Sequence, residues 1–380
     1  MEKRYLFTPG PTPVPPEVLA AMAEPMVHHR GADFRAVYER ALARLQDVFR
    51  TEADVLLFAA SGSGAMDSAA ANLCSPGDRV AVVSAGAFGE RWAAICEQYG
   101  LDVQRIGYEW GDVPVPAEVG AAVADSGAGV VFCTHSETST GVVSDIQGLK
   151  QAVGDATLVV DAISSLGAVP LETDAWAIDV VVSGSQKALM CPPGLAMASI
   201  TEPLWERLPQ ARSFYFDWRR SHKAQQVFDS AFTPAVSLIR GLDVALGLIM
   251  EAGLDAAFDR HVRLGRAARA GLKAMGLELF SPDDESSAVV TVANVPDGID
   301  GTELLRLLRD RHGVTLAPGQ GHLKGKIFRI GHIGWFDIFD IAAALAAVEL
   351  SLTELGAEIE RGVAVPRAFE AFEPSLRLPG

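Results

Sequence analysis

Short runs of β-branched and other apolar residues alternate with helical patterns between about residue 55 and residue 200. This alternation constrains the fold more than any other feature of the chain. The runs occupy residues 55–58, 80–83, 129–132, 158–160, 180–182 and 195–198, and helical patterns such as residues 89–96 and 146–153 lie between them. This order predicts βαβ units and therefore an α/β fold with a mostly parallel sheet flanked by helices. Ligands of such sheets bind beyond the carboxyl ends of the strands, so the residues that follow each run are candidates for a site.

The chain changes character after about residue 255. A helical pattern over residues 260–275 is followed by a strand at 288–293, a helix at 301–312, a strand at 326–330 and an Ala/Leu-rich helix at 338–355. We therefore predict a large domain over residues 26–255 and a small C-terminal α+β domain over residues 256–380. Residues 1–25 are rich in proline, which fixes φ and biases the preceding residue away from helix, so we expect an extended N-terminal segment there.

The composition and charge of this chain of 380 residues argue against several classes of function. Hydrophobic residues make up 49% and charged residues 21%, which is typical of a globular protein, and no apolar stretch is long enough to span a bilayer. A net charge of -16 disfavours binding to nucleic acid, because that affinity comes mainly from cations that neutralise phosphates. The first residues lack the apolar segment of a signal peptide, so we expect a cytoplasmic protein. The four cysteines have no metal-ligand spacing, and we expect no metal site.

A Gly-rich loop at residues 59–65 separates the first apolar run from a helical pattern. Free N–H groups at the start of a helix, together with the hydroxyls of Ser61 and Ser63, suit a bound phosphate. The loop is equally compatible with an ordinary strand-to-helix turn. It lacks the third glycine of a dinucleotide fingerprint, and the next strand ends without an acid for a ribose. A dinucleotide-dependent oxidoreductase is therefore disfavoured.

Asp161 ends the run at residues 158–160, and Lys187 follows the run at residues 180–182 in the sequence SGSQK. A carboxylate can hold a proton on a pyridine nitrogen, which makes the ring an electron sink. Small residues beside a lysine let its stem reach across the sheet edge, where burial lowers the pKa toward that of a nucleophilic amine. Two ordinary roles stay open, Asp161 as a helix N-cap and Lys187 as a solvated side chain. Because the two runs are consecutive strands, both side chains are expected to meet one bound ring.

Arg329 lies on a predicted strand of the small domain, in the sequence FRIG. A guanidinium group binds a carboxylate through two parallel hydrogen bonds, which an amino-acid substrate requires. An alternating strand can equally expose an arginine to solvent, so both roles stay open at this point.

Together, eight stretches resemble the class V aminotransferases of pyridoxal-phosphate (PLP) fold type I, the group with alanine–glyoxylate, serine–glyoxylate and serine–pyruvate aminotransferases. The resemblance covers essentially the whole chain. The matching stretches are TPGPT at 8–12, SGSG at 61–64, THSETSTG at 134–141, VDAISSLG at 160–167, SGSQK at 183–187, PPG at 192–194, TPAV at 233–236 and FRIG at 328–331.

The resemblance implies a PLP enzyme in which each candidate residue has a role. Lys187 would carry the cofactor as a Schiff base and move protons, Asp161 would pair with the pyridinium, and Arg329 would bind the substrate carboxylate. The remaining cofactor residues would be Ser63, Gly64, Ala65 and Gln186 at the phosphate, Phe88 stacked on the ring, Thr138 at the ring or its phenolic oxygen, and Thr233 at the phosphate of the neighbouring subunit. A homodimer with shared active sites follows from the last of these roles.

The sequence departs from parts of the family pattern. Ser230 stands where the alanine–glyoxylate enzymes have a tyrosine that reaches the phosphate across the dimer, and the ring-stacking aromatic, a tryptophan in some members, is Phe88. His28 and His29 before Arg30 are more similar to the serine–glyoxylate branch, and either a substrate contact or a structural role at a helix end fits them.

The resemblance implies ping-pong transfer of an amino group from a small donor, with alanine or serine favoured, to a 2-oxo acid such as glyoxylate or pyruvate. Aspartate, aminoethylphosphonate and ureidoglycine stay open as donors. A cysteine desulfurase or related lyase is disfavoured because residues 315–321 contain no cysteine. A non-catalytic binding subunit is disfavoured because Lys187, Asp161 and Arg329 occur together.

Overall fold

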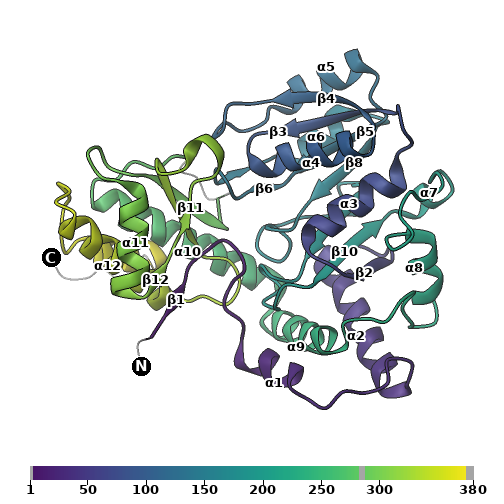
Figure 1. Cartoon of the computed structure of the whole chain (residues 1–380), viewed down its shortest axis with the longest axis horizontal. Helices are drawn as coiled ribbons and strands as arrows, with labels where there is room; N and C mark the ends of the chain where they lie inside the picture. The colour runs from purple at the N-terminus through teal and green to yellow at the C-terminus, as the bar shows by residue number, and fades with distance from the viewer. Residues whose placement is uncertain (1–2, 282–286, 374–380) are drawn as a thin grey trace.

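The computed structural model describes residues 3–281 and 287–373, which form two lobes (Figure 1). The larger lobe surrounds a seven-stranded sheet, and the smaller lobe contains a three-stranded sheet. The described N-terminal segment begins beside the smaller lobe and runs to the larger lobe (Figure 1).

The large sheet confirms the predicted, mostly parallel α/β architecture. In spatial order its strands are β2 (Val55–Ala59), β10 (Leu195–Ile200), β9 (Val180–Gly184), β8 (Thr157–Asp161), β5 (Val130–Thr134), β3 (Arg79–Ser84) and β4 (Asp102–Gly107). Strand β10 is antiparallel to both of its neighbours, and the other pairs are parallel. Every predicted run is a strand. Edge strand β4 was not predicted, because its partly exposed sequence DVQRIG contains no apolar run.

Helices cover both faces of this sheet. One apolar core contains residues from α3 (Gly62–Leu73), α4 (Ala87–Gln98), α7 (Glu202–Trp205) and α8 (Trp218–Gln225); the other contains residues from α2 (Ala32–Phe49), α5 (Pro116–Ser126), α6 (Ile146–Val153) and α9 (Val236–Ala252). Successive residues of one strand alternate between these cores, with Val159 in the first core and Leu158 and Val160 in the second. The central strands are apolar throughout because both of their faces are buried.

The smaller lobe confirms the predicted α+β elements within a few residues. Its elements are α10 (Leu254–Ala274), β11 (Val290–Asn294), α11 (Gly301–His312), β12 (Val314–Thr315), β13 (Ala317–Pro318), a 3₁₀ turn (Gly321–Leu323), β14 (Ile327–Gly331), α12 (Ile338–Glu354) and α13 (Ala364–Phe372). The first turn of α10 packs in the large-lobe core through Leu254 and Phe258, whereas Leu264 and later residues pack in the small-lobe core. The domain limits at residues 25 and 255 stay predictions.

The expectation of a wholly extended N-terminal segment is wrong in part. Strand β1 (Tyr5–Leu6) pairs in parallel with β12, but residues after it form helix α1 (Pro16–Met22). Pro16 stands at the first helical position, where its fixed φ suits the helix and its missing N–H has no intrahelical partner to lose. Proline content alone therefore does not exclude a helix that begins at a proline.

The two described ranges contain neither a membrane-spanning helix nor a metal-binding cluster. No helix within them combines the length and apolar character that a membrane crossing requires. The side chains of these residues form no cluster of His, Cys, Asp and Glu suited to a metal ion. Cys74, Cys96, Cys133 and Cys191 are free and buried. The cytoplasmic location stays a prediction.

Replacing Phe7 by alanine tests how firmly the N-terminal segment is anchored. The Phe7 ring is 1% exposed and stacks on Phe336, with the ring centroids 5.6 Å apart. We expect Phe7→Ala to lower the free energy of unfolding of the small lobe by about 3–5 kcal/mol, because it removes a buried aromatic ring. The matched control is Phe339→Ala, since that ring is 70% exposed and its loss should cost about 0.5 kcal/mol or less. Urea unfolding measures both variants, and equal losses would contradict the anchoring role.

Candidate active site

The carboxyl ends of β2, β3, β5, β8 and β9 meet at one edge of the large sheet. Their parallel direction places the residues that follow each strand around a cavity of about 270 Å³. The cavity is lined by Gly10, Pro11, Ser61, Gly62, Ser63, Phe88, Arg91, Ser136, Asp161, Ile163, Ser164, Gln186, Lys187 and Pro193. Five of the predicted site residues therefore come together here: Ser63, Phe88, Asp161, Gln186 and Lys187.

Lys187 is buried, with only 8% of its surface exposed, so the solvated alternative is wrong. Its Nζ donates a hydrogen bond of 2.5 Å to the carbonyl oxygen of Pro9. Burial lowers the pKa of Lys187 to about 8; Asp161 opposes this effect, and Arg329 reinforces it. The neutral, nucleophilic amine is therefore far more populated near neutral pH than in an ordinary lysine, and it predominates above about pH 8.

Gly10 shows why the N-terminal sequence TPGPT requires a glycine. A Cβ atom at Gly10 would lie 2.4 Å from both Cε and Nζ of Lys187, and Gly10 has a φ of +146°. Real Cβ atoms do not approach other atoms so closely, and side chains rarely adopt this φ. The backbone of residues 9–11 thus forms one wall around the amine.

Asp161 ends β8 beside β9, which leads to Lys187, as the order of the apolar runs predicted. The residues that follow Asp161 form turns rather than a helix, so the N-cap role is wrong, although Oδ1 accepts a hydrogen bond of 2.8 Å from the Ile163 N–H. Burial raises the pKa of Asp161 to about 7; the Ile163 hydrogen bond and Lys187 oppose this shift, and Glu137 adds to it. A cation bound next to this carboxyl group would favour its ionised form.

The Gly-rich loop forms the start of α3, with Ser61 as the residue before the helix. Gly64 and Ala65 donate their N–H groups to the Ser61 carbonyl oxygen at 2.8 and 3.3 Å. The Gln186 side chain lies nearby, and its Oε1 is buried without a hydrogen-bond partner among the described residues. The predicted contacts of Ser63, Gly64, Ala65 and Gln186 with a phosphate stay predictions.

Glu137 fixes the start of α4 and thereby the position of Phe88. Its Oε2 accepts hydrogen bonds from the N–H groups of Phe88 and Gly89 at 2.9 and 3.1 Å. Its Oε1 accepts from the Ser139 N–H at 3.1 Å and from the Ser139 hydroxyl at 2.5 Å. Burial raises the pKa of Glu137, and these four hydrogen bonds oppose the shift. The backbone at Phe88 is therefore held by a buried carboxyl group from strand β6 (Ser136–Glu137).

Arg329 and Thr138 meet each other at the boundary between the lobes, outside the residues that line the cavity. Arg329 is 5% exposed, so the solvent-exposed alternative is wrong. Its Nη1 donates to the Thr138 carbonyl oxygen at 2.6 Å, and its Nε donates to the Pro318 carbonyl oxygen at 2.9 Å. Burial lowers the pKa of Arg329 to about 10, with Glu137 opposing the shift, which leaves the guanidinium charged at neutral pH. The roles of both residues toward ligands stay predictions.

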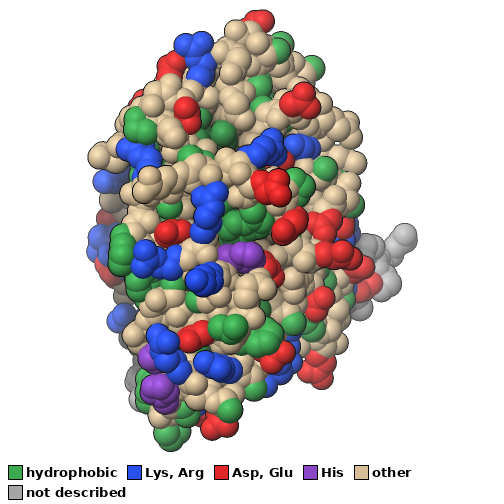
Figure 2. All heavy atoms as spheres, turned by 90° about the vertical axis from the view of Figure 1, so that its right-hand side faces the viewer, with side chains coloured by type: hydrophobic (Ala, Val, Ile, Leu, Met, Phe, Trp, Pro, Cys, Tyr) green, Lys and Arg blue, Asp and Glu red, His purple; other side chains and the backbone are tan. Residues whose placement is uncertain are grey.

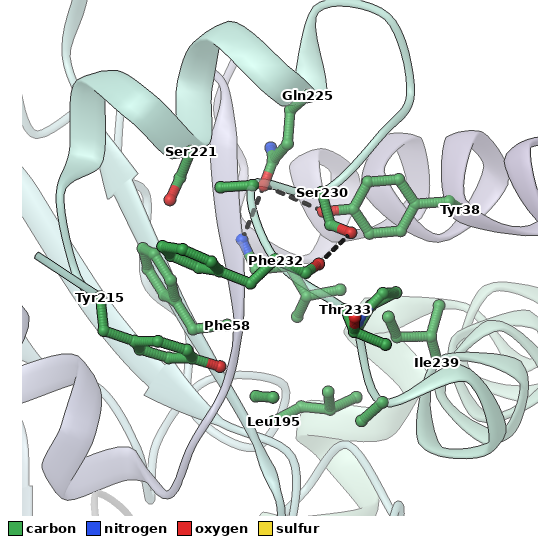
Figure 3. A pocket seen from close by; sticks show the side chains of 15 residues that line it. Tyr38, Phe58, Leu195, Tyr215, Ser221, Gln225, Ser230, Phe232, Thr233 and Ile239 are labelled. Carbon is green, nitrogen blue, oxygen red and sulfur yellow. Dashed lines mark hydrogen bonds between the residues drawn. The ribbon is translucent and has the colours of Figure 1, made fainter. Parts of the chain in front are cut away.

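Thr233 does not line the Lys187 cavity. It lies with Ser230 and Phe232 in a separate pocket, shown in Figure 3, next to Tyr215 and Tyr38. Ser230, the residue in place of the family tyrosine, donates its hydroxyl to the Phe232 carbonyl oxygen at 2.6 Å, a bond drawn in Figure 3. Its side chain thus stabilises its own loop, and the predicted reach of Thr233 to a neighbouring subunit stays a prediction.

The segment His28–His29–Arg30 has contacts of a structural kind. The His28 carbonyl oxygen accepts the N–H of Gly31, which precedes α2, at 2.9 Å. Arg30 forms a salt bridge of 3.2 Å with Asp229, beside Ser230. Neither histidine lines the Lys187 cavity, and the choice between a substrate contact and a helix-end role for their side chains stays open.

The residues of this site that were not identified from the sequence include Gly10, Glu137 and Arg91. Glu137 is the single acid within a run of small hydroxyl residues, an unusual setting for a carboxylate. Arg91 follows Phe88 by three residues, a spacing that places two side chains on the same face of a helix. Both features were present in the sequence, but only tertiary contacts distinguish them from ordinary surface residues.

Comparison with known proteins agrees with this geometry. The sequence model of the family Aminotransferase class-V matches residues 4–327. The chain is 42% identical to the soluble hydrogenase small subunit of a Synechococcus species, over 93% of this chain and 94% of that protein. It is 33% identical to the serine–glyoxylate aminotransferase of Methylorubrum extorquens, over 96% and 95% of the two chains. The crystal structure of ureidoglycine–glyoxylate aminotransferase from Bacillus subtilis matches with a TM-score of 0.93 at 30% identity, covering 98% and 99% of the two chains.

The lowered pKa of Lys187 predicts how its reactivity depends on pH. Below about pH 8 the amine is protonated and unreactive, and above it the neutral amine predominates. Timed acylation of the cofactor-free protein, followed by mass spectrometry of the peptide that contains residue 187, should give a rate that is half-maximal near pH 8. Lys187→Ala identifies the peptide signal. A midpoint near 10.5, the ordinary lysine value, would contradict burial as the controlling influence.

Proposed function

Because the chain belongs to the class V aminotransferase family, whose members are PLP-dependent transaminases of fold type I, we propose a specific reaction for it. A small amino acid, alanine or serine, donates its amino group, and a 2-oxo acid such as glyoxylate or pyruvate accepts it in a ping-pong cycle. The observation that supports this proposal most directly is the buried Lys187 amine beside Asp161, at the edge where five strand ends meet.

The residues of the cavity fit PLP. The Gln186 amide has a buried oxygen without a partner among the described residues, and rotation of the amide presents its NH₂ group as a donor instead. The start of α3 lies beside this amide and favours an anion. Ser63, Gly64, Ala65 and Gln186 would hold the phosphate, Phe88 would pack on the ring, Thr138 would approach the ring or its phenolic oxygen, and Lys187 would hold the cofactor covalently.

When bound, PLP supplies a pyridinium ring that stabilises negative charge at the α-carbon of the substrate. The Asp161 carboxylate keeps the ring nitrogen protonated, since ionised carboxylate and pyridinium stabilise each other. Lys187, whose lowered pKa favours the neutral amine relative to an ordinary lysine, would be the base that removes the α-proton at its Nζ. The same Nζ, once protonated, would be the acid that returns a proton.

Arg329 is proposed to bind the α-carboxylate of both the amino acid and the oxo acid. Its charge is retained in a buried setting, where a bidentate hydrogen-bonded pair with a carboxylate is strong. The two aminotransferases compared above are named for glyoxylate as one substrate, which supports glyoxylate as the acceptor. The name of the Methylorubrum extorquens enzyme also includes serine, which supports a small amino acid as the donor of the amino group. Aspartate, aminoethylphosphonate and ureidoglycine are the alternative donors.

We also propose a homodimer in which Thr233 reaches the phosphate of the partner's cofactor. Next to Thr233 lies an exposed aromatic group, in which Phe214 is 71% exposed and its ring lies 5.6 Å from that of Phe232. Figure 2 shows the face that carries α8, where hydrophobic side chains lie among cationic and anionic ones. Exposed aromatic side chains next to the Thr233 loop are the kind of surface that a second subunit covers.

Desulfurase chemistry has little support in the described residues. Burial raises the pKa of Cys191 to about 12, so its thiol is neutral at physiological pH and unsuited to attack the sulfur of a bound cysteine. The other three cysteines are buried as well. The hydrogenase name of one relative describes that protein, and Lys187, Asp161 and Arg329 together match an aminotransferase.

The proposed reaction is tested with purified protein and PLP. Alanine or serine with glyoxylate should yield glycine and the oxo acid of the donor, with parallel lines in double-reciprocal plots, and each half-reaction should change the visible spectrum of the bound cofactor. Lys187→Ala should lower kcat by at least 10³-fold, roughly the scale of losing a catalytic base. Wild-type protein that binds no PLP would refute the proposal. Faster release of sulfide from cysteine would favour the lyase, and hydrogen evolution without transamination would favour a hydrogenase role.

Substitutions of Arg329 test the carboxylate role. We expect Arg329→Gln to lower kcat/KM by about 10- to 100-fold, mainly through KM, because a charge-assisted bidentate pair is lost. Arg329→Lys should recover only part of the loss, since lysine cannot form the bidentate pair. Lys326→Gln, an exposed neighbour on the same segment, serves as the control and should leave KM unchanged. An unchanged KM in Arg329→Gln with a normal cofactor spectrum would exclude the proposed contact.

A further inference from the structure

Arg91 is a cation of the cavity to which no role has yet been assigned. It lies on α4, three residues after Phe88, and its side chain is exposed at the rim of the cavity. Its Nη1 donates a hydrogen bond of 3.0 Å to the hydroxyl oxygen of Ser63. Its Cζ lies 4.7 Å from the centroid of the Phe88 ring. Arg91 therefore contacts the residue proposed for the phosphate and the residue proposed for the ring.

The direction of the bond to Ser63 determines what the hydroxyl can do. A guanidinium group only donates, so Ser63 Oγ is the acceptor and its own hydrogen is free to point at another acceptor. Phosphate oxygens are strong acceptors. The arrangement thus provides both a hydroxyl and a guanidinium group to a phosphate at the start of α3.

Charge gives a second reason for a cation at this position. The chain carries a net charge of -16, and Asp161 and Glu137 are buried near the same cavity. Both the global field and these carboxyl groups disfavour a dianionic phosphate. Helix N–H groups supply partial charges only, whereas Arg91 supplies a full positive charge beside Ser63.

We infer that Arg91 binds the phosphate group of PLP together with the Ser63 hydroxyl, an inference that rests on the proposed function. The guanidinium group remains stacked on Phe88, so one side chain links the phosphate end of the cofactor to its ring end. Arg91 is accordingly a cofactor-binding residue that takes no part in proton transfer.

The test compares two cofactor forms, PLP and pyridoxal, which lacks the phosphate. Dissociation constants are measured by absorbance and fluorescence on protein freed of cofactor, for wild type, Arg91→Gln, Arg91→Lys and Ser63→Ala. We expect Arg91→Gln to weaken PLP binding by about 10- to 100-fold, the range for a lost charge-assisted hydrogen bond, and to leave pyridoxal binding unchanged. Arg91→Lys should fall between wild type and Arg91→Gln.

Arg105→Gln is the matched control, because Arg105 lies on the neighbouring strand β4 and pairs with Glu97 at 2.6 Å, away from the cavity. It should leave both dissociation constants unchanged. Equal weakening of PLP and pyridoxal by Arg91→Gln would show a general effect on the fold or the ring and would overturn the inference. Unchanged binding of both PLP and pyridoxal by Arg91→Gln would also overturn the inference. Melting temperatures of the cofactor-free variants identify any folding defect. If Arg91→Gln has such a defect, the inference is tested with Arg91→Lys and with inorganic phosphate as a competitor of PLP for the wild-type protein.

The two proposals fail in distinguishable ways. If wild-type protein bound no PLP, the proposed function and the inference would both be wrong. If wild-type protein bound PLP and transaminated while Arg91→Gln retained its full affinity, only the inference about Arg91 would be wrong.

Discussion

The enclosure of Lys187 by the N-terminal segment is the constraint on which the rest of the site depends. The amine donates to the Pro9 carbonyl oxygen, and the backbone oxygen of the same lysine accepts the Thr12 hydroxyl at 3.2 Å. This segment is also attached to the smaller lobe, since the Phe7 carbonyl oxygen accepts the N–H of Gly331 at 2.7 Å. Gly331 lies on β14, two residues after Arg329. The position of the amine relative to the arginine is thus set by a short stretch of chain that contacts both.

Enclosure has an electrostatic cost that the cavity offsets internally. A single unpaired charge moved out of water costs several kcal/mol, about the free energy of folding of a small domain. Here three cationic side chains, Lys187, Arg329 and Arg91, lie near two carboxyl groups, Asp161 and Glu137. The pKa values of Lys187 and Asp161, about 8 and about 7, both move toward the neutral forms. Burial thus favours the neutral form of each of these two groups, and a pyridinium ring bound beside Asp161 would favour its ionised form.

The sequence was sufficient for much of the fold and for the central pair of the site. Buried strands with both faces covered are apolar throughout, so their apolar runs could be recognised in the sequence. The strands that lead to Asp161 and Lys187 are consecutive in the chain, which predicted that the two residues lie close together. Strand β4 was missed because an edge strand needs no apolar run. Glu137 and Arg91 were missed because their importance arises from contacts with Phe88 and Ser63 on other elements, which local patterns do not encode. Thr233 lines a different pocket from Lys187, and its contact with a neighbouring subunit stays a prediction.

The hydrogen bond from Arg329 to Thr138 connects β14 of the smaller lobe to the loop that follows Glu137 in the larger lobe. Thr138 is adjacent to Glu137, whose carboxyl group holds the N–H groups of Phe88 and Gly89. A second bond between the lobes, from the Ser287 hydroxyl to the Gly141 carbonyl oxygen at 3.0 Å, attaches the other end of the same loop. The loop whose Thr138 carbonyl oxygen accepts from Arg329 thus also holds, through the Glu137 carboxyl group, the start of α4, the helix that carries Phe88 and Arg91.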